Sequence, residues 1–329
     1  MKLPRNRGET KIVFMKTFNK RGLYVAGFAL VSAFFISNNT TSVLDFKSPS
    51  AAADSRFDFR YSGVVNTGSE VMPLVGQLSK DGNKLYLTSQ NMRGSKQLYV
   101  MAREKAGDAF GKPTKLTGVG NDEGYDIVMP TLSGDEGTMV FVSSTDGTQR
   151  GNDLYIAQRT EGGFIGVRPL EEINDATTSE SYPWLSKDGL RLYFSKQKGS
   201  AISFFSAERT SLDAKFSAPV KLDITVKDIN NNMSCYLTND EKEIFILSGD
   251  KIYSATRGTV KEKFGEPVEI AAANNSQGFM NGIALTDNKQ EMYVFNSVGF
   301  RNTQILKFEN AATKTTVKPG IENKTLQIK

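Results

Sequence analysis

The stretch LSKDGLRLYF at residues 185–194 decides the fold, because four variants of it recur along the chain. It contains Leu, then Ser or Thr, a short acidic turn and an apolar triplet centred on an aromatic residue. Two apolar runs around an Asp-Gly pair predict a β-hairpin. The other copies are residues 78–87 (LSKDGNKLYL), 132–141 (LSGDEGTMVF), 237–246 (LTNDEKEIFI) and 285–294 (LTDNKQEMYV).

Two further phrases follow each copy in a fixed order. The first is Leu-Tyr-x-x-x-Arg or a close relative, at residues 98–103, 154–159, 204–209, 252–257 and, decayed, 305–308. The second is Phe-x-x-Pro, at residues 110–113, 216–219 and 264–267; the second copy keeps only Phe164 and the fifth lacks the phrase. Ser79, Ser133, Ser186, Thr238 and Thr286 lie 54, 53, 52 and 48 residues apart. Three landmarks at one period indicate a tandem structural repeat.

Each repeat supplies four short β-segments. The apolar residues before Leu-Ser form the first strand, and the Leu-Tyr-Phe triplet after the turn forms the second. The Leu-Tyr-x-x-x-Arg phrase forms the third strand, and the residues that start at the proline of Phe-x-x-Pro form the fourth. A four-stranded antiparallel sheet at this period is typical of a propeller blade. We therefore predict an all-β chain, a β-propeller of about five blades with six as the alternative, over residues 57–310. Residues 57–65 alternate suitably for a strand that closes the ring, and residues 315–328 of the tail 311–329 are the alternative donor.

The combined phrases resemble the WD40-like propeller repeats of TolB and of OmpA-associated exported proteins. The resemblance covers about residues 66–308, nearly all of the chain after the N-terminal segment. It implies the fold and an exported protein. TolB-like proteins carry an additional N-terminal α/β domain, and OmpA-associated proteins end in a peptidoglycan-binding domain. Too few residues separate the linker from the first repeat for the α/β domain, and residues 311–329 are too short for the peptidoglycan-binding domain, so we do not transfer those proteins' roles.

The N-terminus reads as an export signal. Residues 22–36 are apolar or small and follow Lys16, Lys20 and Arg21, which is the pattern of a signal peptide. We predict that residues 1–36 form a signal peptide or membrane anchor helix and that residues 37–56 form a flexible linker. Cleavage at residues 51–53 (AAA) or 40–42 (TTS), or an uncleaved inner-membrane anchor, all stay open. The expected location is the periplasm or the exterior.

Composition excludes several classes of function. Residues 1–21 carry a net charge of +6 and the rest of the chain −1, so we expect no nucleic-acid partner. The chain contains no histidine, which removes the commonest general base and metal ligand. Its one cysteine, Cys235, cannot form an intramolecular disulfide, and we expect it to be buried and inert. No cofactor and no metal site are predicted.

The candidate binding residues lie on the approach to the hairpin. Tyr182 and Trp184 belong to the first strand of the third repeat, which should line the central channel. Three glutamates precede the first strands at matching places and could ring one face: Glu70, Glu123 and Glu180. The turn acids Asp81, Asp135, Asp188, Asp240 and Asp287 have a simpler explanation, because Asp bonds its own backbone in turns.

These observations predict a monomeric, exported, non-catalytic scaffold that binds a protein or peptide in the cell envelope. Contact with the membrane is expected only through the N-terminal segment. The alternative is a carbohydrate-binding propeller, or one that cleaves carbohydrate with carboxylates alone. A deep channel with two carboxylates beside an exposed Trp184 would favour that alternative.

Overall fold

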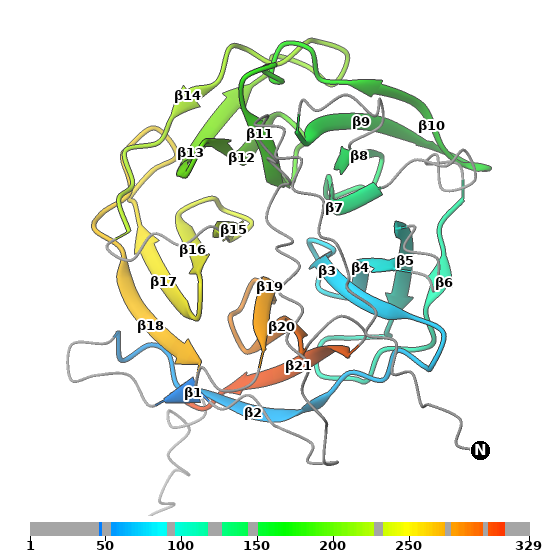
Figure 1. Ribbon diagram of the computed structural model, residues 1–329, viewed down its shortest axis with the longest axis vertical. Helices are drawn as coiled ribbons and strands as arrows, with labels where there is room; N and C mark the ends of the chain where they lie inside the picture. Colours follow the sequence, from blue (N-terminus) through cyan, green and yellow to red (C-terminus); the bar gives the residue numbers. More distant parts are fainter. Residues whose placement is uncertain are drawn as a thin grey trace, which may run out of the picture.

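The chain forms a five-bladed β-propeller, which confirms the predicted fold class (Figure 1). The computed structural model describes residues 46–47, 54–90, 96–117, 127–143, 151–226, 233–273, 278–298 and 302–312. The predicted signal or anchor helix (1–36) and the alternative closing segment (315–328) lie outside these residues. No helix among the described residues has the length and apolar character needed to cross a membrane.

Each blade is an antiparallel sheet, and in the first four blades the four main strands run in chain order from the axis to the rim. The first blade contains β3 (Met72–Leu78), β4 (Lys84–Gln90), β5 (Lys96–Ala102) and β6 (Thr114–Lys115). The second contains β7 (Ile127–Leu132), β8 (Thr138–Ser143), β9 (Asp153–Thr160) and β10 (Gly163–Pro169). The third contains β11 (Ser179–Leu185), β12 (Arg191–Lys198), β13 (Ala201–Glu208) and β14 (Val220–Lys221). The fourth contains β15 (Met233–Leu237), β16 (Glu243–Ser248), β17 (Lys251–Thr256) and β18 (Val268–Ala273).

The two ends of the propeller share the fifth blade. This blade contains β19 (Phe279–Leu285), β20 (Glu291–Ser297) and β21 (Thr303–Asn310), and its outer strand is β2 (Phe59–Val64). β2 pairs antiparallel with β21, which confirms the closing strand predicted at residues 57–65. Asn310 joins the two ends, because its Oδ1 accepts from the Asp58 N–H at 2.9 Å and its Nδ2 donates to the Arg56 carbonyl at 3.0 Å.

The N-terminal segment also supplies the aromatic phrase that the fifth repeat lacks. Phe57 is 3% exposed and meets the ring of Phe245 edge-on at 5.7 Å. Phe110 of the first blade meets Tyr293 in the same way at 5.6 Å. The phrase missing from the fifth repeat is therefore present in space, more than 200 residues earlier in the chain.

Buried aromatic rings hold neighbouring blades together. The second strand of each blade carries most of the largest side chains that are fully enclosed, as the alternation of its sequence predicts. They include Tyr86, Phe141, Phe194, Phe245, Tyr293 and Phe295.

In four of the five repeats, the turn aspartate accepts hydrogen bonds within its own hairpin. Ser133 donates its hydroxyl to Asp135 at 2.6 Å, and Asp135 also accepts from the Gly137 N–H. These bonds lower the pKa of Asp135 below its ordinary value. Asp81, Asp188 and Asp240 accept in the same way from the Ser or Thr two residues earlier. Asp287 differs, because it accepts from the Asn239 N–H of the neighbouring turn at 2.7 Å.

The arginine and phenylalanine of the repeat form a structural clamp. Arg257 donates Nε to the carbonyl of Glu241 in its turn at 2.9 Å, and its guanidinium lies 4.2 Å from the centroid of Phe264. The other three clamps are Arg103 with Phe110, Arg159 with Phe164 and Arg209 with Phe216. These arginines therefore have a structural role, since each one ties the turn of its blade to the phenylalanine of the same repeat.

Three of the clamps are bonded to a tyrosine of the preceding blade. The pairs are Arg103–Tyr293 at 2.9 Å, Arg159–Tyr86 at 3.2 Å and Arg257–Tyr193 at 2.7 Å. Val140 stands at the tyrosine position that precedes Arg209. Consequently Nη2 of Arg209, a residue 6% exposed, has no hydrogen-bond partner among the described residues. The interface between the second and third blades is held by other hydrogen bonds, such as those from the Gly134 N–H to the Lys187 carbonyl at 2.8 Å and from the Leu185 N–H to Thr131 Oγ1 at 3.0 Å.

Candidate functional site: the central channel and the loop face

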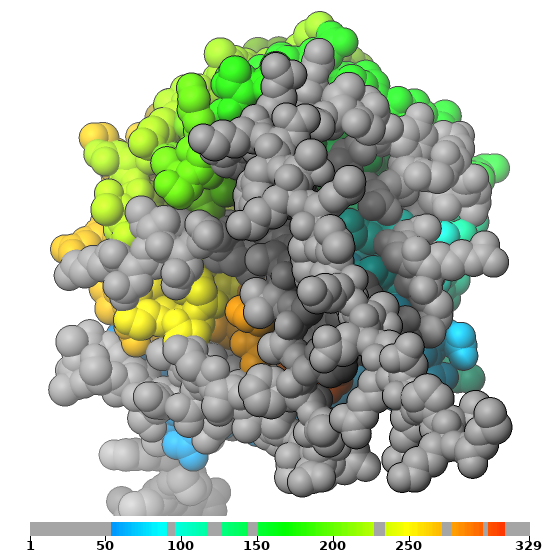
Figure 2. Space-filling model, viewed as in Figure 1, coloured from blue at the N-terminus to red at the C-terminus, as the bar shows by residue number. Residues whose placement is uncertain are grey.

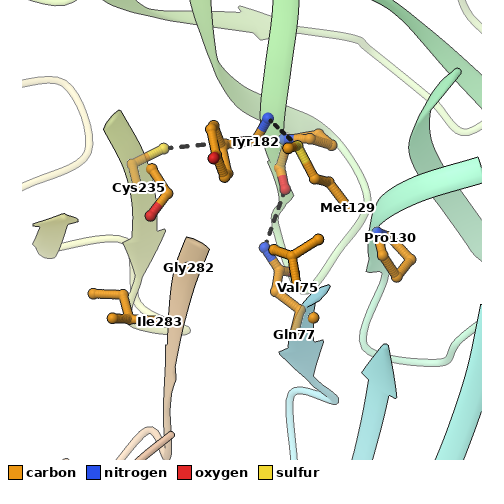
Figure 3. A pocket seen from close by; sticks show the side chains of 11 residues that line it. Val75, Gln77, Met129, Pro130, Tyr182, Cys235, Gly282 and Ile283 are labelled. Atoms are coloured by element: carbon orange, nitrogen blue, oxygen red, sulfur yellow. Dashed lines mark hydrogen bonds between the residues drawn. The ribbon is translucent and has the colours of Figure 1, made fainter. Parts of the chain in front are cut away.

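The first strands of all five blades surround the axis and enclose a cavity of only about 20 Å³ (Figure 3). That volume suits a single water molecule. Most of the lining residues stand two and three positions before the Leu of each repeat. They are Val75, Gly76, Met129, Pro130, Tyr182, Pro183, Ser234, Cys235, Gly282 and Ile283, together with Gln77.

Hydrogen bonds between blades hold this channel narrow. Gln77 Nε2 donates to the Pro183 carbonyl at 3.1 Å, and the Tyr182 hydroxyl donates to the Asn281 carbonyl at 3.3 Å. The backbone of Tyr182 lies between two sulfur atoms, Met129 Sδ at 3.4 Å and Cys235 Sγ at 3.9 Å. Tyr182 thus contacts three other blades from a half-buried position at the channel.

The backbone at the channel is unusual at Met129 and Tyr182. Both have positive φ angles, 54° and 50°, although neither is glycine. Both lie at register shifts, within Val128–Thr131 and Ser181–Trp184. The bulges turn these side chains toward the axis, which is why the channel is filled.

Trp184 is covered by a lysine of the first blade. The indole is 0% exposed, and Nζ of Lys80 lies 3.5 Å from the ring centroid. Burial lowers the pKa of Lys80 to about 7, while Glu241 and Asp287 oppose this shift. Trp184 Nε1 has no hydrogen-bond partner within the described ranges. The binding role predicted for Trp184 stays a prediction, and the structure places the ring inside the molecule.

The three predicted glutamates occupy different surroundings. Glu180 begins the same strand as Tyr182 and Trp184, is 0% exposed and lies 3.2 Å from Lys196 Nζ. Burial raises the pKa of Glu180, and the Thr178 hydroxyl bond at 2.5 Å and Lys196 partly offset this. Glu70 is exposed beside Ser69 ahead of β3. Glu123 lies outside the described residues, so the proposed ring of carboxylates stays a prediction.

In the first blade, an alignment of the repeats by their prolines selects the wrong residues for the channel. The prolines suggest that Met72-Pro73 corresponds to Met129-Pro130, yet Val75 and Gly76 line the channel in the first blade. The first blade has its bulge earlier, between Pro73 and Val75, so its proline marks a different place. Counting back from the Leu of each repeat would have found the correct residues.

A polar cleft of about 270 Å³ lies where the fourth and fifth blades meet. Its acids and bases are largely paired with each other, as shown by Lys289 Nζ, which lies 2.6 Å from Glu243. Arg56 lies 2.9 Å from the other oxygen of Glu243. The cleft is lined by Thr238, Asp240, Lys242, Glu243, Thr256, Arg257, Asp287 and Lys289.

The two faces of the ring differ in how their connections vary. We call the face with the hairpins between first and second strands the turn face, and the opposite one the loop face. All five hairpins between first and second strands have the same length, from Leu78 to Lys84 in the first blade and from Leu285 to Glu291 in the fifth, whereas the links between third and fourth strands on this face differ in length. On the loop face, β12 and β13 join tightly between Lys198 and Ala201, whereas β8 ends at Ser143 and β9 starts at Asp153. Phe279, at the loop-face start of β19, is 71% exposed.

Among the described residues, no group of three or more acidic or cysteine side chains is arranged to hold a metal ion.

Comparison with known proteins finds similar solved structures but no matching family. No family model matches the chain, and no curated protein matches it. Similar solved structures include TolB from Acinetobacter baumannii, at 14% identity, 73% of this chain, 55% of that chain and a TM-score of 0.39. They also include a mannose phosphorylase from Leishmania mexicana, at 12% identity, 78% and 90% coverage and a TM-score of 0.47.

A gluconolactonase from Xanthomonas campestris is also similar, at 11% identity, 81% and 95% coverage and a TM-score of 0.49. This chain spans about half of the TolB chain. With TM-scores below 0.5, these likenesses support no conclusion about this chain's activity. The repeat phrases and the observed ring show that the chain is a five-bladed β-propeller.

Proposed function

We propose that this chain is an exported, non-catalytic scaffold that recognises a protein or peptide at the loop face of the propeller. The observation that carries the proposal is the contrast between the five equal hairpins that join first and second strands and the uneven connections that join second and third strands on the loop face. Binding residues concentrate on loops that a rigid frame positions, and connections of unequal length give such a face its own shape.

The chemistry of the described loop face supports recognition by contact. Phe279 exposes an aromatic ring, and aromatic side chains are enriched at protein interfaces. Glu70 adds an exposed carboxylate next to the first strand of the neighbouring blade. A partner with an apolar residue and a basic residue at its surface would fit these two groups.

Two observations favour this proposal over a carbohydrate-cleaving propeller. Cleavage by carboxylates needs two of them about 5–10 Å apart across a substrate site. The residues that line the central cavity are apolar or neutral, Trp184 is covered by Lys80, and Glu243 in the polar cleft is paired with Lys289. In four repeats the turn acids are bonded within their hairpins, so they serve the fold.

Location is part of the proposal. The signal-like N-terminus supports export to the periplasm or beyond, with membrane contact only through that segment. The single propeller is expected to act as a monomer.

Affinity capture with matched surface variants tests the function. Immobilised wild-type protein and the variants Phe279→Ser (loop face) and Lys187→Ser (turn face) are exposed to extract of the source cell's envelope. We expect a specific protein to be retained by wild type and Lys187→Ser and to be lost with Phe279→Ser. Equal retention by all three, or release of sugars from envelope glycans by the purified protein, would refute the proposal.

A further inference from the structure

The outer strand of every blade leaves one edge that can accept another strand, and most of these edges are protected. Unpaired edges are templates for added strands, so proteins shorten, bend or cover them. β6 and β14 are two residues long and follow Pro113 and Pro219. β10 is bent at Gly166, where φ is 65° and the register shifts, and it ends at Pro169. β2 has a register shift at Gly63.

The edge of β18 is longer than those of β6 and β14 and already carries an added strand, although β18 also follows a proline, Pro267, and has a register shift beside Ala271. β18 has six residues and contains neither proline nor glycine. The fourth blade is five-stranded, because β1 (Phe46–Lys47) pairs antiparallel with β18 (Figure 1). Phe46 lies opposite Ala273, and Lys47 lies opposite Ala272. This edge is therefore a working strand acceptor within the chain itself.

The ring does not need β1. The four strands of every blade are complete with β2–β21, and the N-terminal closure begins with Arg56 and Phe57. The predicted cleavage position at residues 51–53 falls between β1 and this closure. Cleavage there would remove β1, keep the closure and expose the edge of β18.

We propose that the outer edge of β18 is a peptide-binding site, which β1 occupies in the uncleaved chain and an extended segment of a partner protein occupies after β1 is removed. The partner segment adds antiparallel to β18 through backbone hydrogen bonds, as β1 does. One of the two partner residues opposite Ala272 and Ala273 directs its amide toward β18, so that residue is not proline. While attached, β1 acts at a high effective concentration and blocks the site. The inference deepens the proposed function and names a second surface for it, on the rim.

A peptide taken from the chain provides the direct test, because both forms of the protein contain the whole ring. A fluorescent peptide of residues 42–50 is titrated against residues 54–329 and against residues 37–329. We expect saturable binding to the shorter form and binding at least about tenfold weaker to the longer form, where β1 competes. A control peptide carries N-methyl groups on the amides of Phe46 and Lys47, which removes the pairing donors, and should not bind.

Hydrogen exchange gives a second readout at the site. The amides of Ala272 and Ala273 differ in direction, and the one that points away from β17 should exchange at least about tenfold faster in residues 54–329 than in residues 37–329, and should slow again when the peptide is added. The proposal is wrong if both forms bind equally, if the N-methylated peptide binds as well, if neither form binds, or if exchange does not change.

This result is separable from the test of the loop face. If the peptide fails to bind but capture still depends on Phe279, only the β18 site is lost. If peptide binding succeeds and capture is independent of Phe279, the edge survives and the loop-face function does not.

Discussion

The hydroxyl of Tyr193 lies 2.7 Å from Nη2 of Arg257 and 2.8 Å from Oε2 of Glu241, and so joins the third blade to the fourth. Glu241 in turn accepts two bonds from Arg191 at 2.6 and 2.7 Å. One phenol therefore connects a base and an acid that would otherwise be buried with fewer partners.

Replacing Tyr193 by Phe should weaken this interface. The change removes a buried hydroxyl and leaves a charged donor less satisfied, so the free energy of unfolding should fall by about 1–3 kcal/mol. Denaturant unfolding measures the loss. The half-buried Tyr61, whose ring packs on Phe308, is the control, and Tyr61→Phe should cost less than about 0.5 kcal/mol. Equal losses in the two variants would contradict the structural role of the Tyr193 hydroxyl.

Arg56 and Phe57, which begin the ring closure, should contribute very differently to the free energy of unfolding. Phe57 is buried against Phe245, so Phe57→Ala should lower the free energy of unfolding by about 3–5 kcal/mol. Arg56 is 48% exposed, and Glu243 keeps Lys289 and Ser254 as partners without it. Arg56→Ala should therefore cost only about 0–1 kcal/mol. The same unfolding assay compares them, and a larger loss for Arg56→Ala would contradict this account.

Lys80 should make stability depend on pH above neutrality. Burial lowers its pKa to about 7 from 10.5, so between these values the unfolded chain holds more protons than the folded chain. The free energy of unfolding should consequently rise with pH across this window, by up to about 1.4 kcal/mol per pH unit, and the penalty of the buried charge is fully present below pH 7.

The variant Lys80→Met should flatten that rise, since it removes the titrating group and keeps an apolar stem over Trp184. The exposed Lys187, at the same position of the third repeat, is the matched control. Unfolding curves at several values between pH 6 and pH 10 measure the slope. A slope that Lys187→Met reduces as much as Lys80→Met does would rule out Lys80 as its source.

Cys235 should report on opening of the channel. It is 5% exposed, and burial raises the pKa of its thiol to about 12, so thiolate is scarce at neutral pH. Alkylation by iodoacetamide should be at least about a hundredfold slower in the folded protein than in the unfolded protein. Ser69→Cys, at an exposed position, supplies the fast reference. Rapid alkylation of Cys235 under native conditions would contradict a closed channel.

The repeat could be predicted because its phrases combine turn chemistry with alternation. The Asp residues that bond their own turns, the closing strand at residues 57–65 and the number of blades all follow from local patterns. The same patterns place Tyr182 on the channel, where the structure has it.

What the sequence missed depends on contacts between distant parts of the chain. A lysine in a hairpin turn is normally solvated, and nothing near Lys80 in sequence indicates that it lies over Trp184. Phe57 could not be assigned to the fifth repeat by period, because it precedes all the other copies. The bulge in β3 likewise shifts the register in a way that the proline at position 73 disguises.

Because Asp58 and Asn310 are hydrogen-bonded in one sheet, the fifth blade cannot form completely until β2 and β21 are both available to pair. Joining residues 252 positions apart makes this the most entropically demanding step of assembly, and we expect it to come last. A polypeptide that crosses a membrane unfolded through a translocation pore could therefore close this ring only after its C-terminal strands had also crossed.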